Sequence, residues 1–568
     1  MENKTFGKDL KNIIMPNQLL FRRWFRSLGL GAIYAILSAI PVSAAERIYF
    51  DYGPLALSIS VDSLETFAKE GKINKELEFY LKRVSEENQD TFREVLQTKQ
   101  EVDPVQLYRF FHTPIGEQLL TGFGKIIQIQ GGSNGKFSIR GALVQAAADP
   151  EGLTVLNFMR KFSTNIELNT DQILEVSGLF EKIVKATDEM VSQISRLAAL
   201  EAATENTVDF STLPDIRKTG EFGVNKQTIT LKDDSRQREF IVELYQPQRW
   251  RTGQTPVVIA SHGLASTPEH FEEPAQHLAS YGYVVALLQH PGSDLTQLQN
   301  MLEGYSKEIF RLEEFIDRPL DVSYVLDELE RRNQTEFAGR LNLKEVGVIG
   351  HSFGGYTALA LAGAEINFER LETDCNRVVW DPNLSLLVQC RALELPRKVY
   401  NFRDPRVKAA IAINPVNSSI FGPIGLSQIQ IPVFLGAGTL DPATPAVLEQ
   451  MRSFTWLNTP NKHLGLLEGQ AHVNFSQLDA GTKAMIDSLP NLKLPPQSLI
   501  DDYGNVMMLS FLEVHVATNP EYRPYLHSSY AEYISQEPFK FYLISSSSVD
   551  ELNQAIVEFK AREGIVDR

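Results

Sequence analysis

Short apolar runs alternate with helical segments in the second half of this chain, and this alternation constrains the fold more than any other feature. The runs have the length and apolar content of buried strands, and they occupy 227–233, 238–247, 256–263, 283–290, 346–352, 407–415 and 431–438. Continuous apolar strands separated by helices are typical of a mostly parallel sheet that is covered on both faces. We therefore predict an α/β fold with a doubly wound sheet over residues 223–545.

One of these strands leads directly into a glycine-rich turn that carries a serine. The motif GHSFGG (350–355) stands between the strand at 346–352 and a helix of small residues. A G-x-S-x-G match is weak by itself, but in this context it predicts the strained turn that lifts a hydroxyl above a sheet. We predict that Ser352 is a nucleophile and that Gly350 and Gly354 form its nucleophile elbow.

A serine hydroxyl is a poor nucleophile without a base and an acid that orients the base, and in this architecture both follow the serine along the chain. Asp441 comes directly after the strand at 431–438, at the end of the sheet where ligands bind in open α/β folds. We predict that it is the acid, and the alternative is that it only caps the N-terminus of the following helix. His472 lies in a loop, whereas His463 precedes or opens a strand. The predicted catalytic residues are Ser352, Asp441 and His472.

An acyl-transfer site also needs hydrogen-bond donors for a tetrahedral oxyanion. One predicted donor is the backbone N–H of Phe353, which follows the nucleophile. The other is the backbone N–H of Leu264, in the loop after the strand at 256–263. Three nearby histidine side chains are predicted to be structural: His262, His290 and His351.

Together these residues predict a serine carboxylic ester hydrolase that works through an acyl-enzyme intermediate. The expected partner is a small-molecule or lipid ester, with peripheral membrane contact in the lipid case. Neither a metal ion nor an organic cofactor is required. One alternative keeps the triad and makes the protein an acyltransferase or a peptidase. Another is an envelope binding or scaffold protein whose hydrolase domain is idle.

Charge and cysteine content exclude several other classes. A formal net charge of −16 disfavours non-specific binding to nucleic acid. The only two cysteines, Cys375 and Cys390, are too few for a cysteine-built zinc site or an iron–sulfur cluster. We expect a disulfide between them if the protein is exported, because bridges persist in oxidising compartments. Both lie in a cap-like insertion at 367–406, which would cover the acyl pocket or be an inert surface excursion.

The N-terminus has the three parts of a secretory signal. Basic residues are followed by the apolar run SLGLGAIYAILSAI (27–40) and then by small residues up to Ala45. We predict that 1–45 is a signal peptide, with an uncleaved membrane anchor as the alternative. The expected location is the periplasm or cell envelope.

The region between this signal and the sheet is predicted to be an all-α domain. Apolar positions recur at helical spacing over 46–205, most clearly in 170–204, and no catalytic pattern occurs there. The polar, turn-rich stretch 206–222 is the predicted linker, and 546–568 is the predicted C-terminal helix. The helical domain would serve in packing or would cover the catalytic site.

Several of these segments carry a family resemblance. The pieces SHGLAS, ALLQHPGSD, GHSFGG, GTLDPATP and EGQAHVNF resemble the α/β-hydrolase superfamily, in particular its platelet-activating-factor acetylhydrolase and dienelactone-hydrolase-like branch. Two features depart from that branch. Dienelactone hydrolases use a cysteine nucleophile, and the plasma-type acetylhydrolases carry the acid after an earlier strand, which here ends in Asn414-Pro415. The first half, with stretches such as HTPIGEQLL and ALVQAAADPEGLTVLNFMRKF, resembles a helical domain of unknown function found ahead of such hydrolases in cyanobacteria. This resemblance implies an exported or envelope location and no defined activity.

Overall fold

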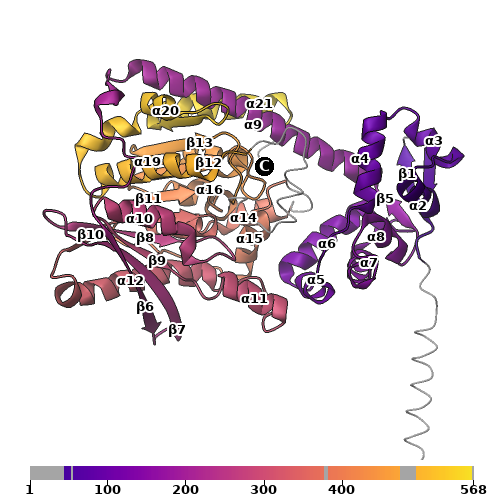
Figure 1. Cartoon of the computed structure of the whole chain (residues 1–568), viewed down its shortest axis with the longest axis horizontal. Coiled ribbons are helices and arrows are strands. Elements are labelled where there is room, and N and C mark those ends of the chain that lie inside the picture. Colours follow the sequence, from indigo (N-terminus) through magenta and orange to yellow (C-terminus); the bar gives the residue numbers. More distant parts are fainter. Residues whose placement is uncertain (1–43, 53–54, 377–381, 474–493, 566–568) are drawn as a thin grey trace, which may run out of the picture. The chain divides into compact units, whose positions relative to one another are not determined.

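The computed structural model describes residues 44–52, 55–376, 382–473 and 494–565, and these form two compact units (Figure 1). Of the described residues, the first unit takes those within 44–100, 129–133 and 141–167, and the second takes those within 101–128, 134–140 and 168–565. The predicted signal peptide, 1–45, lies outside the described residues except for Ala44 and Ala45.

The N-terminal region contains a small sheet that the sequence analysis did not predict. Its strands have the order β2-β1-β5-β3-β4; they are β1 (Arg47–Tyr52), β2 (Leu55–Ser60), β3 (Ile127–Ile129), β4 (Ser133–Asn134) and β5 (Ile166–Leu168). The helices of this region are α2 (Val61–Glu70), α3 (Lys75–Leu81), α4 (Glu86–Gln97), α7 (Lys136–Ala148) and α8 (Val155–Lys161). The region is therefore not all-α, because the short β1 and β2 pair with each other along their whole length.

The second unit is built around a nine-stranded sheet with the order β14-β13-β12-β11-β10-β8-β9-β7-β6. Its strands are β6 (Val224–Asp233), β7 (Arg238–Pro247), β8 (Thr255–Ser261), β9 (Val284–Leu288), β10 (Leu341–His351), β11 (Val407–Ile413), β12 (Val433–Gly438), β13 (Lys462–Leu467) and β14 (Phe541–Ser545). The strands from β13 to β9 run parallel, whereas β6, β7 and β14 pair antiparallel. The mostly parallel sheet was predicted; the edge strand β14 was not.

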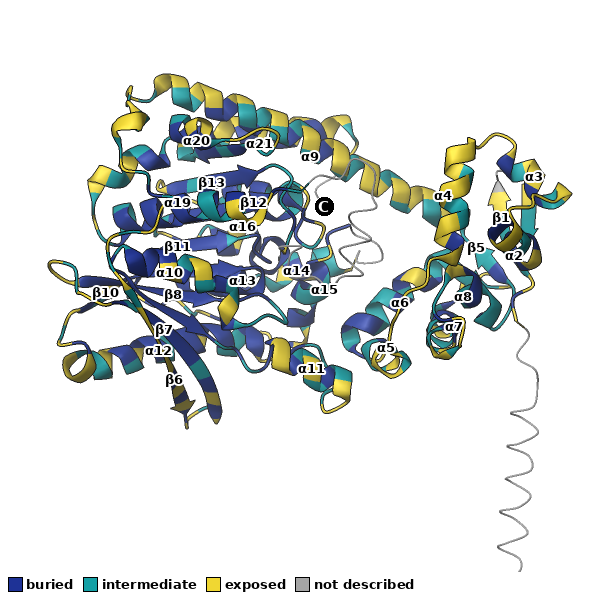
Figure 2. Ribbon diagram, in the orientation of Figure 1, coloured by how far each residue is buried: buried dark blue, intermediate teal, exposed yellow. Residues whose placement is uncertain are grey.

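Both faces of this sheet are covered, as continuous apolar strands require. Along β8, Val257 and Ile259 belong to one apolar cluster and Val258 and Ala260 to the other, so successive residues pack on opposite faces. Figure 2 shows the inner strands β8 and β9 buried along their whole length, whereas the edge strand β6 is largely exposed. Helices α10 and α19 pack on one face, whereas α12, α13, α16, α17 and α21 pack on the other.

The helices of the second unit are α5 (Pro104–Phe110), α6 (Pro114–Ile126), α9 (Thr170–Thr204), α10 (Glu272–Ser280), α11 (Leu295–Glu303), α12 (Glu314–Glu336), α13 (Phe353–Ala362), α14 (Phe368–Cys375), α15 (Leu386–Gln389), α16 (Ser418–Leu426), α17 (Arg452–Trp456), α19 (Gln497–His515), α20 (Ser528–Ile534) and α21 (Val549–Arg562). Helix α21 lies within the predicted C-terminal helix at 546–568. The last residues of that segment, 566–568, are not among the described ones.

Helix α9 belongs to the second unit, although the predicted domain boundary at 205 placed it with the N-terminal domain. Its C-terminal half buries Met190, Ile194 and Leu197 in the core of the second unit, beside α20, α21 and β14. The polar stretch 206–222, predicted to be a linker, buries Ile216 on the α10 and α19 face. The polarity of this stretch therefore marks a surface segment of the second unit.

The predicted disulfide between Cys375 and Cys390 is present within the insertion at 367–406. The later part of the insertion is held to the core by Glu449, a fully buried carboxylate. This carboxylate accepts hydrogen bonds from the side chains of Asn383, Ser385, Gln389 and Ser418 and from the backbone N–H groups of Asn417 and Ser418. Within the same insertion the side chain of Leu384 is largely exposed, and Trp380 lies outside the described residues.

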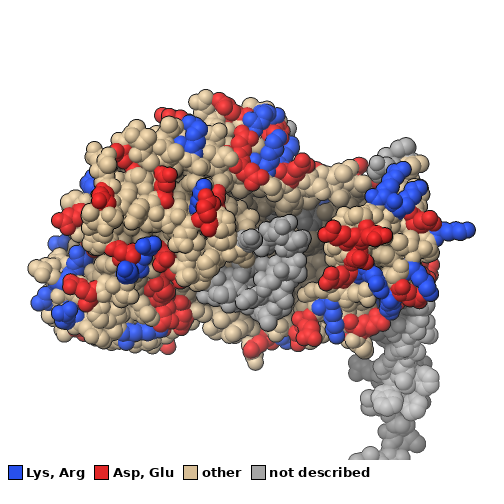
Figure 3. All heavy atoms as spheres, turned by 45° about the horizontal axis from the view of Figure 1, so that its top comes forward, with Lys and Arg blue, Asp and Glu red and all other residues tan. Residues whose placement is uncertain are grey.

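No helix in the described part of the chain is long and apolar enough to cross a bilayer. Within the same residues, no group of three or more histidine, cysteine, aspartate or glutamate side chains could hold a metal ion. Figure 3 shows acidic and basic side chains interspersed over the visible face of the second unit.

Candidate active site

The turn after β10 holds Ser352 in a strained backbone conformation. Its φ of 57° and ψ of −116° lie in a region of backbone conformation that residues other than glycine rarely adopt. Its neighbours approach so closely that a Cβ on Gly350 would lie 1.9 Å from the carbonyl oxygen of Gly354. A Cβ on Gly354 would lie 1.8 Å from that of Ser261. Both glycines predicted for the elbow are therefore sterically required where β10 meets α13.

The structure brings the three predicted catalytic side chains into one hydrogen-bonded chain. Nε2 of His472, which follows β13, lies 2.9 Å from Oγ of Ser352. Nδ1 of the same ring lies 2.7 Å from Oδ2 of Asp441, which follows β12. The carboxylate of Asp441 and the hydroxyl of Ser352 are both buried. All three side chains lie at the carboxyl ends of parallel strands.

The surroundings of Asp441 fix which imidazole nitrogen carries the proton. Oδ1 accepts the backbone N–H groups of Ala443 and Thr444 at 2.8 and 2.9 Å. Oδ2 accepts the Thr444 hydroxyl at 2.6 Å and faces Nδ1 of His472. An ionised carboxylate only accepts, so Nδ1 carries the proton and Nε2 is left to accept the hydroxyl of Ser352. Asp441 is not a helix N-cap, because the next helical segment, Val447–Met451, has Ala446 at that position. Its Oδ1 closes a turn instead, while Oδ2 faces the imidazole.

The segments that carry the two predicted oxyanion donors lie on either side of the catalytic turn in the chain, in the loop after β8 and at the start of α13. Phe353 is the first residue of α13, so its N–H has no acceptor within the helix. The loop after β8 passes beside the nucleophile, since a Cβ on Gly263 would lie 3.3 Å from Cβ of Ser352. Leu264 is the next residue in that loop. Both segments that carry the predicted donors therefore border the nucleophile.

The histidines predicted to be structural are buried and hydrogen-bonded. Nδ1 of His262 donates to the carbonyl oxygen of Gly263 at 2.7 Å, and its Nε2 accepts the backbone N–H of His290 at 3.2 Å. Nε2 of His290 accepts the Ser261 hydroxyl at 2.9 Å, and Nδ1 donates to Asp321 at 3.0 Å. Burial holds the pKa of both rings well below the usual value, and the nearby arginines add to this effect. Both rings are therefore neutral.

His351 has a contact that the sequence did not reveal. Its Nε2 donates to the backbone carbonyl oxygen of His472 at 2.8 Å, and its ring lies between those of His270 and His472. Burial is the main cause that lowers its pKa. The ring thus supports the loop that carries the predicted base. The only sequence signal for this supporting role is its position directly before Ser352.

A cavity of about 730 Å³ extends behind the imidazole, on the sheet face covered by α10 and α19. His351, His472 and apolar side chains such as Phe434 and Met508 line it. Four acidic residues also line it: Glu269, Glu272, Glu273 and Asp501. Ser352 is not among the described residues that line the cavity, so we do not assign it as the acyl pocket.

The sheet order, the elbow after the central strand β10 and the loop positions of Asp441 and His472 define an α/β-hydrolase fold. Residues 212–375, which include Ser352, match the family described as Chlorophyllase. Residues 44–169 match the family described as Alpha/beta hydrolase of unknown function (DUF1400). The resemblance to the α/β-hydrolase superfamily is thereby confirmed. No curated protein matches the chain.

Proposed function

We propose that this hydrolase is a serine carboxylic ester hydrolase with Ser352, His472 and Asp441 as its catalytic triad. The observation that supports this most is the continuous hydrogen-bonded chain from a strained serine through an imidazole to a buried carboxylate. The match to the Chlorophyllase family over the segment that carries Ser352 also supports hydrolysis.

In the proposed mechanism, Oγ of Ser352 attacks the ester carbonyl while Nε2 of His472 takes its proton. The resulting oxyanion accepts the N–H groups of Phe353 and Leu264, and Asp441 stabilises the imidazolium. His472 then protonates the leaving alcohol, which departs as the acyl-enzyme forms. Water, activated by the same imidazole, attacks the acyl-enzyme and releases the acid. Every step uses groups of this chain, the substrate and water.

The proposed substrates are small or lipid esters, as in the acetylhydrolase-like branch that the motifs resemble. Leu440 and Val473 support an apolar ester, because their side chains remain exposed directly beside Asp441 and His472. We also propose export to the periplasm or envelope. The disulfide between Cys375 and Cys390 supports export, since such bridges persist in oxidising compartments. A lipid ester would be met at a membrane surface.

A fluorophosphonate probe tests the proposal, because it reacts only with an activated serine. The mature protein is expected to be labelled, whereas Ser352→Ala is not, with heat-denatured protein as the control. Hydrolysis of p-nitrophenyl esters of increasing chain length then identifies the preferred acyl group. Absence of labelling in folded protein would favour a non-catalytic binding or scaffold protein. Faster product formation with added alcohols would indicate an acyltransferase, and cleavage of peptides a peptidase.

A further inference from the structure

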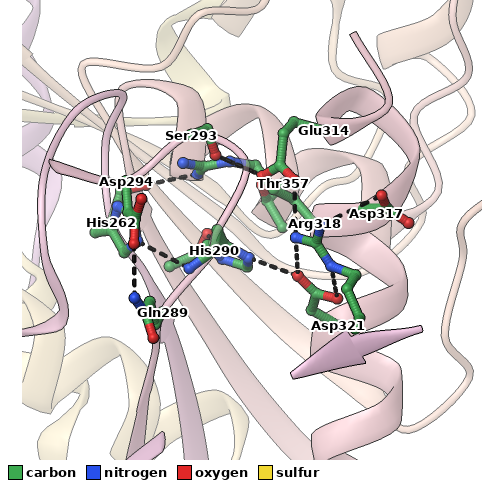
Figure 4. Close-up of polar contacts among 12 residues, drawn as sticks. His262, Gln289, His290, Ser293, Asp294, Glu314, Asp317, Arg318, Asp321 and Thr357 are labelled. Atoms are coloured by element: carbon green, nitrogen blue, oxygen red, sulfur yellow. Dashed lines mark hydrogen bonds and ion pairs between the residues drawn. The ribbon is translucent and has the colours of Figure 1, made fainter. Parts of the chain in front are cut away.

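A fully buried arginine lies behind the loop that carries one proposed oxyanion donor (Figure 4). Arg318 comes from α12, and its Nη1 donates to the carbonyl oxygen of His262 at 2.7 Å. Its Nη2 donates to the carbonyl oxygen of Gly263 at 3.4 Å, and its Nε donates to Oγ of Ser293 at 2.8 Å. The guanidinium therefore holds two consecutive carbonyl groups of this loop.

The same guanidinium contacts the segment that carries the other proposed donor. Its central carbon lies 4.5 Å from the ring centroid of Phe353, within the range of a cation–π contact. The rings of Phe310 and Phe315 pack against Phe353 at centroid distances of 5.5 and 5.1 Å. One buried side chain thus contacts both segments whose backbone N–H groups would bind the oxyanion.

The contact with Gly263 bears directly on the direction of a donor. The carbonyl group of Gly263 and the N–H of Leu264 belong to the same peptide unit, and in a trans peptide these two bonds point in opposite directions. Arg318 and Nδ1 of His262 both donate to this carbonyl oxygen. Fixing the carbonyl therefore fixes the direction of the Leu264 N–H, in a loop that passes beside Ser352.

The charge of Arg318 is balanced within the same buried cluster. Glu314 lies 3.6 Å from it on α12, and Arg238 pairs with both Glu314 and Asp321 at 2.8 Å. Burial lowers the pKa of Arg318 to about 10, so it remains a cation at neutral pH. Arg238 belongs to the same cluster but pairs with carboxylates, which makes it a matched control.

We propose that Arg318 is a positioning residue that sets the geometry of the oxyanion hole by holding the Gly263–Leu264 peptide and the ring of Phe353 together. This inference rests on the proposed ester hydrolysis. The oxyanion exists only after attack on the carbonyl, so a misdirected donor raises the barrier without weakening substrate binding. Loss of one donor lowers kcat by about 10² to 10³-fold, which sets the upper range of the expected effect.

The test compares Arg318→Gln with Arg238→Gln in the full chain. Arg318→Gln is expected to lower kcat for a p-nitrophenyl ester about 100-fold while KM changes less than threefold. Affinity for an alkyl trifluoromethyl ketone, which forms a tetrahedral adduct with the serine, is expected to fall by the same factor as kcat/KM. Arg238→Gln is expected to lower thermal stability comparably and to keep kcat within about fivefold of the wild type.

Arg318→Lys provides a second variant if Arg318→Gln does not fold. It keeps the buried charge, but a lysine ammonium cannot donate to two carbonyls and stack on a ring in the way a planar guanidinium does. We expect a loss of kcat of at least tenfold with KM retained. The inference is overturned if Arg238→Gln loses as much kcat as the Arg318 variants. It is also overturned if Arg318→Lys keeps a kcat near that of the wild type. If the wild type neither hydrolyses esters nor reacts with fluorophosphonate, the proposed function itself fails.

Discussion

Replacing Asp441 by asparagine tests the proposed triad most directly, because the structure determines how the new amide must lie. The backbone N–H groups of Ala443 and Thr444 both point at Oδ1. The asparagine oxygen must take that position, since an NH₂ group there would face two donors. The amide nitrogen therefore faces His472, where the wild-type carboxylate accepts a hydrogen bond of 2.7 Å.

This arrangement inverts the imidazole tautomer. An amide N–H donates to Nδ1 of His472, so the ring proton moves to Nε2, which then faces Oγ of Ser352 as a donor and no longer as a base. In a serine hydrolase this change lowers kcat about 10⁴-fold, or about 5.4 kcal/mol in activation free energy. The turn at Asp441 keeps its backbone hydrogen bonds, so we expect the thermal midpoint to change little.

The assay is steady-state hydrolysis of a p-nitrophenyl ester by Asp441→Asn, with its melting curve measured in parallel. Thr444→Val is the matched control, because it removes a 2.6 Å hydrogen bond to the same carboxylate but leaves the ionised acceptor in place. We expect Thr444→Val to lose about tenfold in kcat. A folded Asp441→Asn protein that retains more than a tenth of wild-type kcat would refute the assignment of Asp441 as the catalytic acid.

Three further changes have expected outcomes. Gly354→Ala places a Cβ 1.8 Å from a backbone oxygen of β8, so it should abolish ester hydrolysis and lower the melting temperature, and unchanged activity would contradict the elbow geometry. Glu449→Ala leaves buried hydrogen-bond donors without an acceptor, so it should lower the free energy of unfolding in urea by about 3 to 5 kcal/mol. A loss below about 1 kcal/mol would mean that water replaces the carboxylate. Below about pH 6.5 the unfolded chain protonates His262, His290 and His351, while the folded chain keeps them neutral because burial lowers their pKa values. Each of these histidines should therefore lower the free energy of unfolding by about 1.4 kcal/mol for every pH unit below about 6.5. Urea unfolding that is unchanged between pH 7 and pH 5 would contradict this expectation.

The candidate site could be located from the sequence because each of its parts is encoded locally. A buried strand followed by Gly350 to Gly354 permits few backbone paths, and only a turn with positive φ at Ser352 fits them. Asp441 and His472 were found because each follows a strand, and the carboxyl ends of parallel strands share one edge. Proximity along that edge follows from topology, so no long-range contact had to be guessed.

The features that the sequence did not reveal depend on long-range packing. The apolar stripe of α9 predicts a helix but not its partner, and Met190 and Ile194 pack against segments that lie far downstream in the chain. The short strands β1 and β2 pair mainly with each other, and their brief apolar pattern was read as part of a helical region. The contact of Arg318 with Gly263 joins residues 55 positions apart, and a single arginine in a helix carries no pattern of its own.

The buried ions around Arg318 are poorly explained by stability alone. Removing charged groups from water costs several kcal/mol per ion, and well-packed apolar side chains of similar volume often stabilise a fold as well or better. What apolar side chains cannot supply is a donor to the carbonyl oxygen of His262 and a second donor to that of Gly263, beside Nδ1 of His262. A rigid planar donor meets this need, and the carboxylates of Glu314 and Asp321 lie close enough to balance the cluster. The location of the cluster thus argues that its cost is offset by the orientation of the loop, which is the effect that comparison of Arg318 with Arg238 measures.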